Sequence, residues 1–160
     1  MTTATANPTE RCVISAEQTL TRYATETVRW PTFTDPDTGQ VRLSLGGSVD
    51  ALSMSAELGH QVNHHLVQAL QLGPIIEVLA RSSASWIYLT QQRTPLRSST
   101  VTELLTAGAC WYDVGSTILL PPAMSRAEYP RWIQRPHTGK GLPRWEAVVG
   151  AVRRAIRSAW

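Results

Sequence analysis

Apolar and polar residues follow a strand-like pattern in several short runs along the chain. The runs at 74–80 and 85–90 are separated only by a serine-rich link, so we expect them to form a hairpin. Gly115 interrupts the last run, and we expect that strand to be broken there. The five runs with a period of two, or with a continuous apolar character, are 41–45, 48–54, 74–80, 85–90 and 109–122.

Apolar residues spaced three and four apart mark helices elsewhere. Ser55 is placed to cap a helix that begins at residue 56, and Gly73 is placed to end it. Thr100 and Glu103 have the spacing of a capping box at the start of a further helix. Pro143 is placed as the first residue of the C-terminal helix. The four predicted helices cover 16–29, 56–71, 100–108 and 143 to the C-terminus.

The order of these elements predicts the fold class. From residue 48 to 120 the order is strand, helix, strand, strand, helix, strand. This is the split βαβ, or ferredoxin-like, arrangement, in which two helices cover one face of an antiparallel sheet. We therefore expect an α+β protein with a ferredoxin/RRM-like βαββαβ core over about 48–120, an added N-terminal helix and a basic C-terminal helix.

Length and composition fit a single domain. A chain of 160 residues with 42% hydrophobic residues can bury one core. Residues 1–12 are small and polar and are expected to be disordered, which leaves one domain at 13–160. No apolar stretch approaches the ~18 residues of a membrane span, and the N-terminus lacks the pattern of a signal peptide. We therefore expect a cytoplasmic protein without a membrane partner.

Positive charge is concentrated in the Arg- and Trp-rich segment 123–160. Residues 126–160 hold eight basic and two acidic side chains, a balance of +6 within a net charge of +3, so residues 1–125 carry −3. Such asymmetry favours a polyanion or an acidic protein as partner. In the last predicted helix the apolar residues, Trp145 included, form one stripe, and the arginines are expected to face away from it.

Three segments, in order, resemble landmarks of bifunctional DNA primase/polymerase (prim-pol) N-terminal domains of the archaeo-eukaryotic primase superfamily. The best match is the LPP run at 120–122, followed by Tyr129 and Trp132, since in the family a strand ends in Pro-Pro-Ser and an aromatic pair follows. The resemblance spans about 46–135 and implies an RRM-like catalytic sheet. The three segments are GGSVDALSMSAELG (46–59), GPIIEVLARSSASWIYLT (73–90) and GSTILLPPAMSRAEYPRW (115–132).

The catalytic residues that this resemblance implies are only partly present. The family uses an Asp-x-Asp pair to hold two divalent metal ions, and a histidine on the central hairpin that contacts the nucleotide phosphate. Asp50 stands at the first acidic position, but Leu52 stands at the second, and the run at 85–90 holds no histidine. Asp113 is the nearby candidate for a later acidic ligand. We therefore expect no polymerase activity and no cofactor, with Mg²⁺ or Mn²⁺ required only if an active enzyme has rearranged ligands.

Two other groups have residue types that bind metals. Asp35 and Asp37 are flanked by proline and glycine, which predict a turn whose side chains cap their own backbone. His60 and His64 share one face of a predicted helix, as two zinc ligands would, but a zinc site needs at least three protein ligands. We expect His60 and His64 to be exposed and His65 to be half-buried.

Nucleic-acid binding is the function that the sequence favours. Basic side chains neutralise phosphates, and exposed aromatic rings stack on bases. The first hypothesis is a catalytically degenerate prim-pol-like domain that acts as a nucleic-acid-associated or regulatory accessory protein on DNA or RNA. One alternative is a protein–protein interaction module on the same fold that docks on an acidic partner, and another is an active primase/polymerase. The candidate nucleic-acid-binding residues are Arg131, Trp132, Arg135, Lys140, Arg144, Arg153, Arg154 and Arg157.

Overall fold

A computed structural model describes residues 30–122, 129–137 and 139–159. Both N-terminal predictions, the disordered segment 1–12 and the helix at 16–29, lie outside these ranges. In chain order the described elements are β1 (Thr32–Thr34), β2 (Val41–Ser44), β3 (Val49–Ser55), α2 (Ala56–Gln68), β4 (Ile75–Ala80), β5 (Ser83–Gln91), α3 (Ser98–Thr106), β6 (Cys110–Trp111), β7 (Thr117–Leu119), β8 (Arg131–Gln134) and α4 (Trp145–Ser158).

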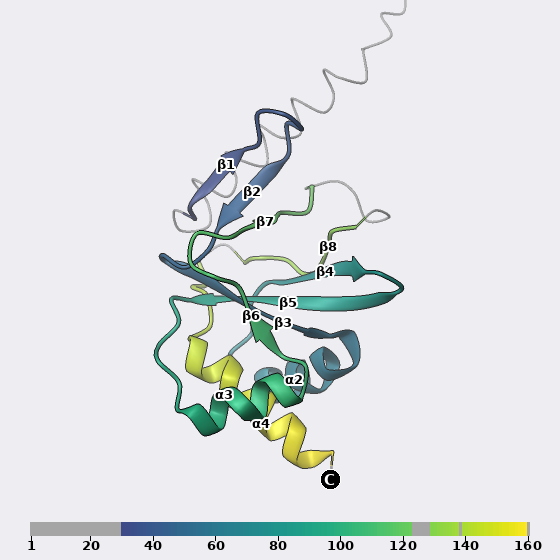
Figure 1. The fold of residues 1–160 in the computed structure, drawn as a ribbon, viewed down its shortest axis with the longest axis vertical. Helices are drawn as coiled ribbons and strands as arrows, with labels where there is room; N and C mark the ends of the chain where they lie inside the picture. The colour runs from purple at the N-terminus through teal and green to yellow at the C-terminus, as the bar shows by residue number, and fades with distance from the viewer. Residues whose placement is uncertain (1–29, 123–128, 138, 160) are drawn as a thin grey trace, which may run out of the picture.

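The chain forms an α+β fold with the predicted ferredoxin-like core. Its larger sheet has the strand order β6-β3-β5-β4-β8, and every neighbouring pair is antiparallel. β3 and β4 therefore run parallel with β5 between them, as in a split βαβ unit. A smaller antiparallel sheet has the order β1-β2-β7. Figure 1 shows the three described helices below the larger sheet and the smaller sheet above it.

The larger sheet is buried on both faces. Successive side chains of a strand point to opposite faces. On β3, Leu52 and Met54 pack with the helices, whereas Val49 and Ala51 pack with the smaller sheet. Strands covered on both faces have continuous apolar sequences, which explains the nearly unbroken run at 48–54.

Helix α2 begins as predicted but ends earlier. The Ser55 hydroxyl accepts a hydrogen bond from the Leu58 backbone N–H at 3.3 Å, which confirms the N-cap. Leu70 has a φ of 55° and closes the helix before the predicted end. Gly73 therefore has a different role: a Cβ there would lie 2.5 Å from Cδ of Pro143, so only glycine allows these two loops to cross.

The two later helices begin at residues other than those predicted. Arg97 is the N-cap of α3, with no side-chain capping bond, so the capping box predicted at Thr100 and Glu103 is wrong. Thr100 is instead buried in the first turn. α4 begins after Pro143, and it buries the predicted apolar stripe, with Trp145 1% exposed. No helix in the described part of the chain is long and apolar enough to cross a membrane.

The run at 109–122 is divided between the two sheets. Trp111 in β6 pairs with Leu52 and completes the larger sheet. The chain turns at Gly115, which has a φ of 85°, and the break expected there is confirmed. Beyond it, Ile118 in β7 pairs with Leu43 of β2 in the smaller sheet. The βαββαβ unit therefore ends at residue 111 and not near 120.

Candidate functional site

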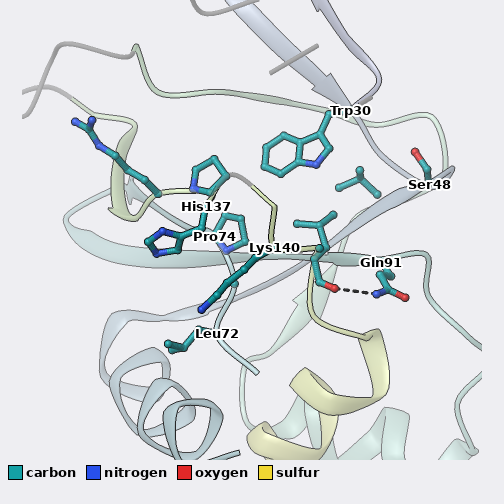
Figure 2. A pocket seen from close by; sticks show the side chains of 13 residues that line it. Trp30, Ser48, Leu72, Pro74, Gln91, His137 and Lys140 are labelled. Carbon is teal, nitrogen blue, oxygen red and sulfur yellow. Dashed lines mark hydrogen bonds between the residues drawn. The ribbon is translucent and has the colours of Figure 1, made fainter. Parts of the chain in front are cut away.

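A pocket of about 350 Å³ opens at one end of the larger sheet (Figure 2). At this end β3 and β4 begin and β5 and β8 end, so four strands converge on it. The volume lies at the lower end of the ~300–1,000 Å³ typical of small-molecule sites. The lining residues are Trp30, Ser48, Val49, Leu72, Gly73, Pro74, Gln91, Arg135, Pro136, His137, Lys140, Gly141 and Leu142.

Basic side chains from the segment after β8 form one wall of this pocket. They are Arg135, His137 and Lys140, and no aspartate or glutamate stands among the described residues of the lining. The Lys140 backbone N–H donates to the His137 carbonyl at 3.2 Å, and Gly139 adopts a φ of 79°, so a tight turn brings both side chains to the pocket. Figure 2 shows Lys140 extending towards Leu72. Arg135 and Lys140 form no ion pair with any residue that the structure describes, which leaves their charge uncompensated.

The remainder of the pocket is largely apolar and firmly built. Trp30 and Val49 belong to the core between the two sheets, and both are buried. The Gln91 side-chain amide donates to the Leu142 carbonyl at 2.8 Å, as drawn in Figure 2, and fixes that loop to the end of β5. The pocket thus combines an apolar floor with a cationic wall, with Ser48 as a polar residue at its rim.

Strand β8, which leads into the cationic wall, is anchored by a buried carboxylate on β4. Glu77 accepts a hydrogen bond from Arg131 Nε at 2.7 Å and another from Trp86 Nε1 at 2.9 Å. Arg131 also lies 4.9 Å from the centre of the Tyr129 ring. Burial acts to raise the pKa of Glu77, but the bonds from Trp86 and Arg131 and the charge of Arg131 together hold it below the ordinary value. Arg131 is therefore engaged within the protein.

The other predicted nucleic-acid-binding residues do not form one surface. Arg153 pairs with Glu103 of α3 at 2.7 Å, and Arg157 approaches the same carboxylate at 3.6 Å. Arg153 is half-buried in this pair, whereas Arg157 is exposed. Arg144, the N-cap of α4, and Arg154 are both exposed but stand ten residues apart along the helix, a rise of ~15 Å. Trp132, also half-buried, packs against the core between the sheets.

Asp50, the candidate remnant of a metal site, is fully buried among the groups that face the helices. Its Oδ2 accepts a hydrogen bond from the Arg93 backbone N–H at 3.1 Å and lies 3.9 Å from Arg93 Nε. Its Oδ1 has no hydrogen-bond partner among the described residues, and the carboxylate is closed off from solvent. These contacts give Asp50 a structural role in holding the loop after β5. Asp113 is exposed beyond β6.

The Asp35–Asp37 segment forms the predicted turn. Asp35 Oδ1 accepts hydrogen bonds from the backbone N–H groups of Asp37 at 2.9 Å and Thr38 at 3.3 Å, so the side chain caps its own backbone. The hydrogen bond from Asp37, supported by Arg42, lowers the pKa of Asp35. The turn thus accounts for the Asp35 carboxylate, while Asp37 contributes its backbone N–H.

The histidines of α2 have protein neighbours of other kinds. The His60 ring lies 4.3 Å from the Trp86 ring, and His64 Nε2 lies 3.0 Å from the Gln68 side-chain nitrogen. His60 and His64 are exposed and His65 is half-buried, as predicted. Across the described ranges, no three His, Cys, Asp or Glu side chains gather as a metal site would require.

Comparison with known proteins assigns this chain to no family. No protein-family model, curated protein or solved structure matches this chain. The prim-pol resemblance therefore stays a prediction from the sequence, and function has to be argued from the site itself.

The sequence identified two basic residues of the pocket as candidates, but it did not predict the pocket itself. Arg135 and Lys140 were predicted from the charge of the C-terminal segment. Trp30, Ser48 and Gln91 carried no signal of their own, because the lining is drawn from segments far apart in the sequence. The Gly139 turn between two basic residues is the local feature that could have indicated a concave basic surface.

Proposed function

We propose that this protein is a nucleic-acid-associated accessory domain that binds phosphate groups at its cationic pocket and does not itself add nucleotides. The observation that carries the proposal is the wall of Arg135, His137 and Lys140 in a pocket lined by no described carboxylate. Uncompensated positive charge beside an apolar floor favours a ligand that carries phosphate together with an aromatic or apolar part.

The chemistry of the wall suits phosphate. Arginine offers a planar fork of donors that bonds two phosphate oxygens at once, and lysine supplies a compact charge with three donors. Arg144 is exposed just beyond Leu142, a residue of the pocket, and extends the positive surface along the chain. Protein cations would neutralise the bound phosphate, because Arg135 and Lys140 line the pocket and its described lining residues include no carboxylate.

This proposal uses fewer residues than the sequence suggested. Arg131, Arg153 and Arg157 have carboxylate partners within the protein, and a phosphate would have to compete with Glu77 or Glu103 for them. We therefore assign the binding to Arg135, His137, Lys140 and Arg144. The residues Asp50 and Asp113 have no role in it.

The test is fluorescence anisotropy of labelled single-stranded and duplex oligonucleotides at about 50 and about 200 mM salt, because phosphate contacts weaken log-linearly with salt. Arg135→Glu/Lys140→Glu should weaken binding by about tenfold or more. Arg97→Glu/Arg154→Glu is the matched control, since it makes the same charge change at exposed residues outside the pocket.

Three results would refute the proposal or a part of it. Equal losses in the two double variants would mean that only net charge matters, and that the pocket is not the site. No binding at low salt would remove nucleic acid as a partner and leave the acidic protein partner as the better explanation of the positive wall. Template-directed nucleotide addition with Mg²⁺ or Mn²⁺, abolished by Asp50→Ala, would contradict the non-catalytic part.

A further inference from the structure

We infer that the pocket is a site for one phosphate monoester joined to a flat or apolar body, the size of a single mononucleotide, and not for a run of diester phosphates. This inference rests on the proposed function, because it names the group that the same pocket takes. Charge, volume and the placement of polar groups each lead to it.

The charge of the wall matches a monoester. A phosphate monoester carries about −1.5 to −2 at neutral pH, whereas each diester of a nucleic-acid backbone carries about −1. Arg135 and Lys140 supply two permanent positive charges within six residues of chain, and the turn at Gly139 brings them to one pocket. His137 adds a ring nitrogen to the same wall. Two positive charges in one small site match one dianionic phosphate monoester better than they match a row of singly charged diester phosphates.

The volume limits the ligand to one unit. About 350 Å³ accommodates one small molecule, whereas a strand or a duplex needs an open groove along which several phosphates can lie. The walls of the pocket are fixed by the bond from Gln91 to Leu142 and by the close crossing of Gly73 and Pro143. The pocket is thus pre-formed and cannot lengthen without breaking these contacts.

The part of the pocket away from Arg135 and Lys140 is suited to a ligand ring that carries polar groups at its edges. Val49, Pro74 and Leu142 offer apolar contact, and Trp30 lines the same space. Gln91 donates its amide N–H to the protein, which leaves its amide oxygen to accept a hydrogen bond from a ligand. The Ser48 hydroxyl can donate or accept at the rim. A base or a sugar attached to the phosphate could present hydrogen-bonding groups here, whereas inorganic phosphate has no attached body to do so.

A phosphate monoester of this kind has two sources, a free mononucleotide or the terminal phosphate of a nucleic-acid strand. Calorimetry on the full chain distinguishes them with four probes: adenosine 5′-monophosphate, inorganic phosphate, and one oligonucleotide with and without a terminal phosphate. We expect the mononucleotide to bind one per chain and more tightly than inorganic phosphate. A preference for the phosphorylated oligonucleotide assigns the source to strand ends, and equal affinity for the two oligonucleotides assigns it to the free mononucleotide.

Two kinds of variant test the location. Arg135→Met and Lys140→Met should each weaken mononucleotide binding by about tenfold, as expected for the loss of a charge-assisted bond, whereas Arg154→Met should not change it. Gly141→Phe should block the pocket. The matched control is Gly47→Phe, because Gly47 is outside the lining, and at neither glycine does an added Cβ meet an atom within 4 Å.

The inference and the proposed function fail in different ways. If oligonucleotides bind with steep salt dependence while the mononucleotide does not bind, or binds no better than phosphate, the inference is overturned and the proposed function stands. If Gly141→Phe leaves mononucleotide affinity unchanged while the variant remains folded by circular dichroism, the ligand is not in the pocket and the inference is again overturned. If neither oligonucleotides nor the mononucleotide bind, both are overturned.

Discussion

Replacing Glu77 with leucine should destabilise the protein substantially, because this carboxylate joins three strands. Glu77 on β4 accepts from Trp86 on β5 and from Arg131 on β8, and it is 6% exposed. Glu77→Leu keeps a side chain of similar size but removes both acceptors. The Trp86 N–H is then buried without a partner, while the Arg131 guanidinium can still turn towards solvent.

The expected cost follows from these two losses. A buried donor left without an acceptor costs about 1–3 kcal/mol. The Arg131 side chain is 38% exposed, so its pairing with Glu77 is screened and contributes up to about 1 kcal/mol. We therefore expect Glu77→Leu to lower the free energy of unfolding by about 1–4 kcal/mol, a large share of the ~5–15 kcal/mol of a typical domain. Glu77→Gln, which keeps an acceptor oxygen, should cost about half as much.

Urea unfolding followed by circular dichroism measures these differences, and a double-mutant cycle isolates the bond. Trp86→Phe removes the donor, so in the Phe background Glu77→Leu should cost about 1–2 kcal/mol less than in the wild type. Additive effects of the two changes, or a cost for Glu77→Leu below about 0.5 kcal/mol, would show that the network does not stabilise the fold.

The same network predicts a dependence of stability on pH. The pKa of Glu77 is lowered in the folded protein below its ordinary value of 4.5, so the ionised carboxylate stabilises the fold above that value. This stabilisation is lost as the pH falls through the lowered pKa. The difference in unfolding free energy between wild type and Glu77→Gln should therefore shrink on acidification from about pH 7 to about pH 3. A difference that stays constant would contradict the ionic role.

Three further changes probe other contacts. Asp50→Ala should cost about 1–3 kcal/mol in urea unfolding, because the Arg93 N–H loses its acceptor, and should leave oligonucleotide affinity unchanged; a stable variant that no longer binds would restore a functional role for Asp50. Gly59→Ala places a Cβ 2.6 Å from Cε3 of Trp86, so the melting temperature should fall despite the better helix propensity of alanine, and a rise would mean that the ring can move aside. Arg153→Gln breaks a half-exposed ion pair, so unfolding should change by less than about 1 kcal/mol and oligonucleotide affinity should hold, whereas a large loss of affinity would assign α4 to the binding surface.

The sequence predicted the core well where side chains repeat with a clear period. The hairpin of β4 and β5, the Ser55 cap and the apolar stripe of α4 all depend on neighbouring residues, so they can be read locally. β8 is absent from the predicted strands because its four residues pair with β4, a strand more than fifty residues earlier in the chain. The Thr100–Glu103 capping box failed because α3 begins earlier, with Arg97 as its N-cap, and Glu103 instead accepts a hydrogen bond from Arg153 of α4.

The candidate site was less predictable than the fold. The distribution of charge along the sequence placed Arg135 and Lys140 in a basic segment. It could not distinguish them from Arg131 and Arg153, whose carboxylate partners lie about fifty residues away in the sequence. The other side of the pocket could not be predicted either, because Trp30 and Gln91 come close to the basic segment only in the folded chain. Tertiary structure determines which of the described basic side chains have a carboxylate partner.

The division of one segment between two sheets makes the smaller sheet depend on a contact between distant parts of the chain. Without β7, only the hairpin of β1 and β2 is left, and an isolated two-stranded hairpin is marginal in water. β7 pairs with β2 across about 75 positions of sequence, and contacts over such separations form slowly. Trp30, two residues before β1, lines the pocket. A ligand held there would also hold the smaller sheet closed, so occupancy of the pocket and completion of folding would favour each other.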